Sequence, residues 1–246
     1  MPAARESLLD AAYTALTERP WTAVRMVEVA AAAGVSRQTL YNEFGSKEGL
    51  ARALVRRETD HYLAGVARAL SRGAPAAGAR GDAAGRIVAA AAWTVRTART
   101  NPLVRAALTG CWGGRLPPAP AVSAGPAPAG TPRRPPGVPA QRAAPSGEGP
   151  LPGPAELVGR FCDQAVAALR PGWPEEELPA LGTACETAAR LTLSWVLAPP
   201  ASGAAPAPGR VPAQRSRREP ETEAVSRLVR SAFARMTAGT QSAEWK

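Results

Sequence analysis

The chain has 246 residues, of which 45% are hydrophobic, and a formal net charge of +10. That length is ample for a hydrophobic core in one large or two modest domains. No stretch approaches the roughly 18 uninterrupted apolar residues of a membrane span, and an acidic residue precedes any long apolar run, which argues against a signal peptide. The three cysteines form no Cys-x-x-Cys pair, so neither a disulfide framework nor a zinc site is indicated. We therefore expect a soluble, cytoplasmic protein with no metal or other cofactor.

The positive charge is spread unevenly along the chain. Residues 1–70 carry eight Arg and one Lys against eight acidic residues, a net charge of +1, whereas residues 71–112 carry six Arg and one Asp. The overall charge is therefore weak evidence for a nucleic-acid partner, and such a function must be argued from motifs.

The first 45 residues have the pattern of three short helices. Residues 5–18 show amphipathic spacing, and Pro20 ends that helix because the residue before a proline is pushed out of the α region. A second helix is predicted at 26–33, ended by Gly34, since glycine accepts a positive φ without penalty. Ser36 is a good N-cap for a third helix.

This third helix runs from Ser36 to Phe44 and is separated from the second by the tight glycine turn. Two short helices joined in this way indicate a helix-turn-helix, which places its second helix in the DNA major groove. An ordinary helical hairpin has the same turn, so the turn alone does not decide between the two. The side chains that the pattern leaves facing outward are Arg37, Gln38, Thr39 and Asn42.

A wider set of residues decides between them, because it resembles the N-terminal domain of the tetracycline-repressor (TetR) family. The set comprises Trp21, Glu28, Val29, Ala30, Ala33–Ser36, Leu40, Tyr41, Phe44, Ser46–Glu48 and Leu50. The resemblance implies an all-α homodimeric repressor with a helix-turn-helix DNA-binding domain at 1–48 and a helical ligand-binding and dimerisation domain at 49–246. The implied partners are double-stranded DNA, a second copy of the chain and an unknown small-molecule effector, with no membrane.

Two residues depart from the family pattern. Arg25 stands where the family usually has Thr or Ser to cap the second helix, and Glu43 stands where His or Tyr is frequent. Because an anionic side chain near phosphate is repulsive, we expect Glu43 to point away from DNA or to pair with a cation such as Arg37 or Arg25.

Base recognition is predicted for the third helix. Arg suits guanine and Gln suits adenine, while Thr can touch a thymine methyl group. Phosphate contacts are predicted for a Lys at the start of the following helix, which is one of only two Lys beside 28 Arg, and helix N-termini favour phosphate. The predicted DNA-binding residues are Arg25, Ser36, Arg37, Gln38, Thr39, Tyr41, Asn42 and Lys47.

The remaining sequence predicts further helices at about 46–70, 82–100, 102–109, 155–169, 178–198 and 221–238. Asp82 and Asn101 are plausible caps, and Pro102 suits a first helical position. Trp and Arg residues on these helices hint at an aromatic or anionic ligand. The predicted ligand pocket comprises Trp93, Arg96, Leu108, Trp112, Phe161 and Trp195.

Two Pro-rich stretches interrupt the helices. Residues 113–155 contain thirteen Pro and eight Gly, and such a composition buries too little surface to offset its ordering entropy, so we expect a flexible insertion there and a linker at 199–220. The helices on either side of that linker carry continuous apolar stripes, which predict a four-helix bundle between two subunits, although the stripes can also pack inside one chain. The predicted dimer contacts are Leu181, Cys185, Ala188, Leu228, Ala232 and Phe233.

An enzyme is not expected, because the phosphate-loop, dinucleotide, nucleophile-elbow and zinc-protease motifs are missing from the sequence. The alternative to a DNA-binding regulator is a helical scaffold whose Pro-rich insertion recruits partners.

Overall fold

The computed structural model describes residues 2–72, 82–118, 151–171, 173–198 and 219–238. Over these residues the regular structure is entirely helical, as the sequence predicts. Two compact units are formed: the first comprises residues 1–58 and 112–153, and we call it the head; the second comprises residues 59–111 and 154–246, and we call it the body. Of the helices that the structure describes, none combines the length and the apolar character that a lipid bilayer demands.

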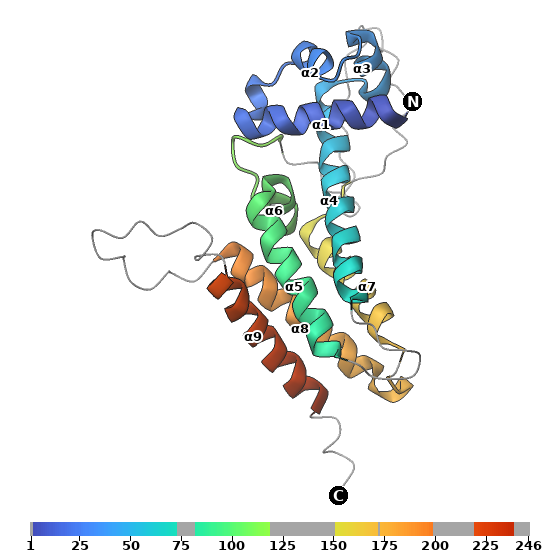
Figure 1. The fold of residues 1–246 in the computed structure, drawn as a ribbon, viewed down its shortest axis with the longest axis vertical. Coiled ribbons are helices and arrows are strands. Elements are labelled where there is room, and N and C mark those ends of the chain that lie inside the picture. The colour runs from blue at the N-terminus through green and yellow to red at the C-terminus, as the bar shows by residue number, and fades with distance from the viewer. Residues whose placement is uncertain (1, 73–81, 119–150, 172, 199–218, 239–246) are drawn as a thin grey trace, which may run out of the picture. The chain divides into compact units, whose positions relative to one another are not determined.

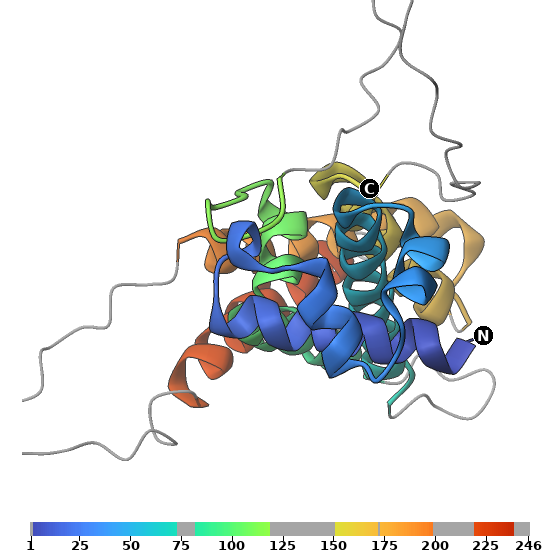
Figure 2. The ribbon, with the colours of Figure 1, turned by 90° about the horizontal axis from the view of Figure 1, so that it is seen from above.

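The head is built on three helices and the start of a fourth. They are α1 (Pro2–Glu18), the short 3-10 turn η1 (Trp21–Ala23), α2 (Met26–Ala32), α3 (Arg37–Phe44) and the first part of α4 (Lys47–Ser71). Figures 1 and 2 show α1 lying crosswise to the first part of α4, and α2 and α3 pack against α1. The core is made of leucines from α1, α3 and α4 that are almost completely buried: Leu8, Leu9, Leu40, Leu50 and Leu54.

A cluster of ionic contacts ties α1 to α4 inside the head. The guanidinium of Arg57 lies 2.7 Å from the carboxylate of Asp10 and 2.8 Å from that of Glu58, and its side chain is only 10% exposed. The same guanidinium donates to the carbonyl oxygen of Leu9 at 3.4 Å. Arg57 and Glu58 are both nearly buried, so water screens their ion pair little, whereas the Asp10 carboxylate is largely exposed and its pair is screened more. The bonds from Arg57 to Asp10 and Leu9 link α4 to α1.

The body contains the rest of α4 together with α5 (Ala83–Thr100), α6 (Pro102–Thr109), α7 (Pro154–Leu169), η2 (Glu175–Glu177), α8 (Leu178–Leu197) and α9 (Glu219–Ala238). Its helix ends confirm the caps read from the sequence. Asp82 accepts from the backbone N–H of Gly85 at 2.7 Å, and Asn101 accepts from two N–H groups at the start of α6, whose first residue is Pro102. Gly110 ends α6 in the left-handed conformation, at φ +71°.

A buried arginine joins two helix ends in the body. Arg86 on α5 is 6% exposed; its Nε donates to the carbonyl oxygen of Leu70 and its Nη2 donates to that of Ala168, the latter at 2.8 Å. Both carbonyls belong to the last turns of their helices, α4 and α7, where intrahelical donors run out and a positive charge is favourable.

The apolar stripes of α8 and α9 pack within one chain. In the body α9 lies against both α5 and α8 (Figure 1), and the alanine-rich face of α5 supplies the partner surface. Four of the predicted dimer contacts, Leu181, Cys185, Ala188 and Phe233, are at most 2% exposed within one chain. Their assignment to a subunit interface stays a prediction, and in the single chain these side chains offer almost no accessible surface to a partner. Periodicity identified an apolar face correctly but did not identify its partner. Leu228, 48% exposed, and Ala232, half-buried, keep accessible surface.

The ends of the Pro-rich insertion are packed, which the sequence did not predict. Pro117, Leu151 and Pro152 are buried, and α7 begins at Pro154. The predicted insertion at 113–155 was therefore too wide at both ends, while residues 119–150 lie outside the described residues. The prediction used the amino-acid composition of the whole stretch. A few Leu and Pro side chains at its ends can nevertheless bury apolar surface without any helical periodicity. Residues 199–218 of the predicted linker also lie outside the described part, and Glu219 already belongs to α9.

Candidate nucleic-acid interface

The turn between α2 and α3 has the geometry of a helix-turn-helix. Gly34 adopts φ +68°, and the backbone N–H of Val35 donates to the carbonyl oxygen of Ala30 at 3.0 Å, which closes the turn. Ala30 is 2% exposed, as expected for a small residue between two closely packed helices. The Ser36 hydroxyl oxygen accepts from the backbone N–H of Thr39 at 3.0 Å and so caps α3.

The outward face of α3 carries pre-arranged side chains. The guanidinium of Arg37 lies over the Tyr41 ring, 5.3 Å from its centroid. Nε2 of the adjacent Gln38 donates to Oδ1 of Asn42, one turn further along α3, at 2.8 Å. Arg37, Gln38 and Asn42 are exposed and Tyr41 is half-buried. An amide nitrogen has two hydrogens, so the bond to Asn42 orients the Gln38 amide and leaves it one N–H and the carbonyl oxygen, the pair that reads adenine.

The start of α4 is held against the end of α3 by an unusually close backbone approach. Gly45 adopts φ +69°, and the N–H of Ser46 donates to the carbonyl oxygen of Phe44 at 2.7 Å. A Cβ atom on Gly49 would lie 1.9 Å from that same carbonyl oxygen. Ser46 caps α4 by accepting from the Gly49 N–H at 3.1 Å. The position of Lys47 relative to α3 therefore depends on two glycines.

The electrostatics of this α4 end favour negative charge. The pKa of Glu48 is lowered, chiefly because its own backbone N–H donates to the carboxylate and secondly because the Ser46 hydroxyl does. Lys47 donates from Nζ to the carbonyl oxygen of Thr22 at 3.3 Å and lies 5.5 Å from the centroid of the Trp21 ring. This ammonium group is therefore directed by η1, a contact that the sequence did not predict, because a backbone carbonyl carries no residue-type signal.

The two departures from the family pattern have structural outcomes. The carboxylate of Glu43 lies 3.6 Å from the guanidinium of Arg5 on α1, so the cation beside it is neither of the two proposed from the sequence. Arg5 in turn lies over the Phe44 ring at 4.9 Å. Arg25 is exposed at the N-cap of α2 and makes no side-chain capping bond, so its guanidinium does not take over the role of the usual Thr or Ser.

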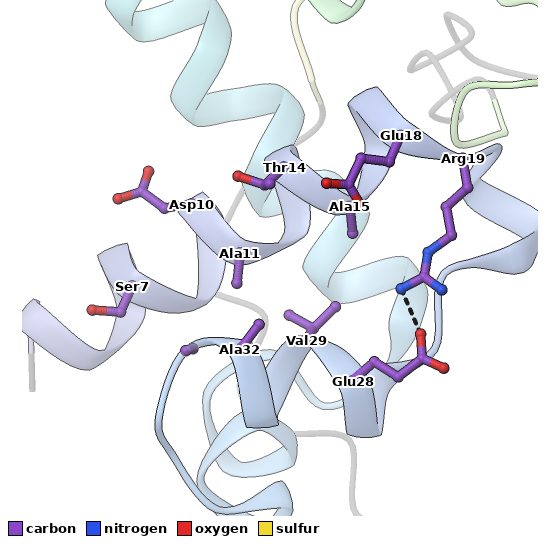
Figure 3. Close-up of a pocket in the computed structure, with 11 residues that line it drawn as sticks. Ser7, Asp10, Ala11, Thr14, Ala15, Glu18, Arg19, Glu28, Val29 and Ala32 are labelled. Atoms are coloured by element: carbon purple, nitrogen blue, oxygen red, sulfur yellow. Dashed lines mark ion pairs between the residues drawn. The ribbon is translucent and has the colours of Figure 1, made fainter.

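A groove of about 570 Å³ lies between α1 and α2 (Figure 3), and none of its lining residues is predicted to bind DNA. Its lining combines alanines with Arg19, whose guanidinium is paired with Glu28 at 2.5 Å, and with the acids Asp10 and Glu18. Three carboxylates against one guanidinium suit phosphate poorly, so this groove is not part of the candidate interface.

The predicted ligand-pocket residues are divided between the two units. Five lie in the body: Leu108 and Phe161 are buried, Trp93 and Trp195 are half-buried, and Arg96 is exposed; the sixth, Trp112, belongs to the head. The Trp93 indole donates to the backbone carbonyl of Tyr62 at 3.1 Å. A body groove of about 750 Å³ lies between α7 and α8 and is lined by other residues, among them Cys162 and the Glu186–Arg190 pair.

Within the described ranges, no three His, Cys, Asp or Glu side chains gather closely enough to hold a metal ion.

Comparison with known proteins finds a match for the N-terminal residues of the head. Residues 8–54 match the family described as bacterial regulatory proteins, tetR family. The HTH-type transcriptional regulator AlkX of Mycobacterium tuberculosis is 48% identical over 62 residues, which are 25% of this chain and 29% of that protein. An uncharacterised HTH-type transcriptional regulator of the same species is 48% identical over 56 residues, 23% of this chain and 28% of that protein. The matched region thus spans less than a third of these curated relatives.

Solved structures were also found to be similar over a greater length. The TetR family repressor AlkX from Dietzia sp., implicated in biodegradation of n-alkanes, shares 20% identity over 95% of both chains with a TM-score of 0.46. A tetR-family transcriptional regulator from Streptomyces coelicolor shares 18% identity over 98% of this chain and 84% of that chain, with a TM-score of 0.49.

The capped α3, the glycine turn and the family match at 8–54 coincide on the same residues. The N-terminal residues 8–54 are thus similar to the DNA-binding region of bacterial regulatory proteins of the tetR family.

Proposed function

We propose that this chain is a sequence-specific DNA-binding transcriptional regulator that acts as a homodimeric, effector-responsive repressor. The observation that carries the proposal is the outward face of α3, the second helix of the helix-turn-helix. Arg37 and Gln38 are exposed there, and Ser36 caps the helix. The head supplies the DNA-binding function, and the domain assignment to 1–48 and 49–246 is part of the same proposal.

The side chains of α3 divide into base readers and phosphate contacts. Arg37 is proposed to contact guanine through its guanidinium edge while its plane stays on Tyr41, and Gln38, oriented by Asn42, is proposed to contact adenine. Thr39 is proposed to contact a thymine methyl group. Arg25, Ser36, Tyr41, Asn42 and Lys47 are proposed to bind phosphates and set the register.

A dimer is required by the small size of one reading helix. Twofold pairing presents two such helices about 34–36 Å apart, which matches half-sites in successive major grooves of a palindromic operator. Since the inner stripes of α8 and α9 are used within the chain, the interface is proposed to involve their outward residues, including Leu228 and Ala232.

The effector is proposed to be a small molecule bound in the body near Trp93, Arg96, Leu108, Phe161 and Trp195, with Trp112 as a further candidate. It releases DNA only if it binds one arrangement of the dimer more tightly than the other.

The test is a gel shift with duplexes from the DNA flanking the gene for this chain, followed by selection from random duplexes. Arg37→Ala is expected to weaken binding to the selected site by about 1–3 kcal/mol and to relax specificity at one base position. Arg68→Ala, which removes an exposed arginine of α4 in the body, is the matched control and should leave specificity unchanged. If no duplex binds even at low salt, the proposed function is wrong.

A further inference from the structure

A segment far from the helix-turn-helix in sequence belongs to the head. Residues 112–118, which we call segment 112–118, follow α6 after only two residues yet belong to the same compact unit as α1, α2 and α3. The segment makes a turn in which the N–H of Leu116 donates to the carbonyl oxygen of Gly113 at 2.9 Å. Within this turn, the carbonyl oxygen of Arg115 bonds a residue outside the segment: it accepts from the backbone N–H of Trp21 at 2.8 Å.

The Arg115 carbonyl oxygen bonds the N–H of Trp21, which has no acceptor within its own helical turn. Trp21 is the first residue of η1, and the first N–H groups of a helical turn lack an internal acceptor. The carbonyl oxygen of Trp21 does have one, since it accepts from Val24 at 3.1 Å. Because Trp21 is only 4% exposed, water is a poor substitute for the Arg115 carbonyl.

Trp21 and Thr22 are also the residues that hold Lys47. The Lys47 ammonium group lies 5.5 Å from the centroid of the Trp21 ring and donates to the carbonyl oxygen of Thr22 at 3.3 Å. A long lysine side chain has many rotamers in solution, so these two contacts restrict where its charge lies. Any displacement of η1 therefore displaces the charge at the start of α4.

We infer that segment 112–118 is a positioning element of the DNA-binding surface: it holds η1 through the Trp21–Arg115 backbone bond and so places Lys47 for a phosphate contact. The inference rests on the proposed function, because it assigns Lys47 to DNA. It adds a part of the chain that lies outside the matched N-terminal domain, residues 8–54, and that was predicted to belong to a flexible insertion.

Two adjacent prolines provide a matched pair of variants. Pro117 is buried and Pro118 is exposed, so Pro117→Ser loosens the segment while Pro118→Ser changes composition equally without removing a packed side chain. Arg115→Ala keeps the carbonyl oxygen and removes the exposed guanidinium, which separates the backbone bond from any direct contact of this cation with DNA.

The experiment measures affinity for the selected operator at several salt concentrations in the full chain. The slope of log K against log salt is negative, and loss of one phosphate contact reduces its magnitude by about 0.9. A smaller folded fraction lowers the amount of active protein without changing that slope. Pro117→Ser is expected to weaken binding about fivefold and to reduce the magnitude of the slope toward that of Lys47→Gln. Pro118→Ser and Arg115→Ala should match the wild type within about twofold.

A double-variant comparison tests the route through Lys47. In a Lys47→Gln background, Pro117→Ser is expected to cause little further loss, because the contact that it disturbs is already gone. The inference is overturned if the two losses multiply, if Pro117→Ser weakens binding at an unchanged slope, or if Lys47→Gln itself leaves the slope unchanged. Should Pro117→Ser fail to fold, replacing residues 113–118 by a Gly-Ser sequence of equal length takes its place with the same expected slopes.

Failure of this inference is distinguishable from failure of the proposed function. If the wild type binds its operator and the Pro117→Ser variant binds it with equal affinity, the proposed function stands and only the role of segment 112–118 is overturned. A wild-type chain that binds no duplex overturns both.

Discussion

In the head, α2 has seven residues and α3 has eight. Directional contacts hold the helices of the head: a hydroxyl cap on α3 at Ser36, the close approach of Gly49 on α4 to a carbonyl of α3, and the ionic cluster of Arg57 between α1 and α4. In the body, α5, α7, α8 and α9 have 16 to 20 residues each and pack through broad apolar faces, which are rich in alanine on α5 and α8. Short helices bury too little apolar surface to determine their own geometry, so the head relies on bonds that tolerate little displacement. The body gains stability from area, which tolerates small changes.

This difference suits what each unit is proposed to do. A reading helix must present side chains to base edges within a few tenths of an ångström, because hydrogen bonds weaken steeply with distance and angle. Four measurements, two that compare the units and two made within one unit, test this contrast.

The largest expected difference concerns glycines. Gly49→Ala should destabilise the head by about 3 kcal/mol, because its Cβ meets a backbone carbonyl that cannot move alone. Gly182→Ala on α8, where nothing lies within 4 Å of the added Cβ, should stabilise the body by about 0.5–1 kcal/mol through helix propensity. Thermal and urea unfolding measure both, and equal effects at the two positions would contradict the contrast.

Next come the two buried arginines. Arg57→Met should cost about 3 kcal/mol and Arg86→Met about 2 kcal/mol, since each removes a nearly buried charged donor and its hydrogen bonds. Arg57 bonds carboxylates, so part of its contribution should be screened in 1 M salt, whereas Arg86 bonds helix-end carbonyls and should respond little. Urea titrations at low and high salt measure this, and a salt-sensitive Arg86 contribution would be evidence against the assignment of its partners.

A smaller effect is expected for cysteine reactivity, which reports on the closure of the body. Burial, helped by the nearby carboxylates of Glu186 and Asp163, raises the pKa of Cys162 to about 11, and burial raises that of Cys185 to about 12. The thiolate is the reactive form, so at pH 8 iodoacetamide should modify exposed Cys111 first, Cys162 slowly and Cys185 last. Mass spectrometry of timed samples gives the order; early labelling of Cys185 would mean that the body opens readily.

The smallest effect is a pH dependence at the start of α4. Because the pKa of Glu48 is lowered in the folded chain, its stabilising contribution is present above the ordinary pKa of 4.5 and is lost as the pH falls through the lowered value. Glu48→Gln should therefore reduce stability slightly at pH 6 and hardly at all near pH 2. Amide exchange in the first turn of α4 measures it, and a difference that grows on acidification would have the wrong sign.

The helix ends could be predicted from the sequence because they depend on local chemistry. Ser36, Asp82 and Asn101 each accept from backbone N–H groups a few residues ahead, and Gly34 and Gly110 take the positive φ that ends a helix. Donor, acceptor and backbone constraint all lie within one turn of the chain, so no distant residue is needed to predict them.

The partner of each side chain, by contrast, depends on the tertiary structure. The stripe of Leu181 and Phe233 was apolar by periodicity, yet whether it faced α5 or a second subunit depended on how the helices packed. Glu43 carried a charge that needed a cation, and α1 brought Arg5 to it. The Arg115 carbonyl acts through the backbone, which every residue shares, so the sequence held no sign that it would meet Trp21. Local patterns specify what a segment can bury or bond, and the packing of the chain selects which partner it meets.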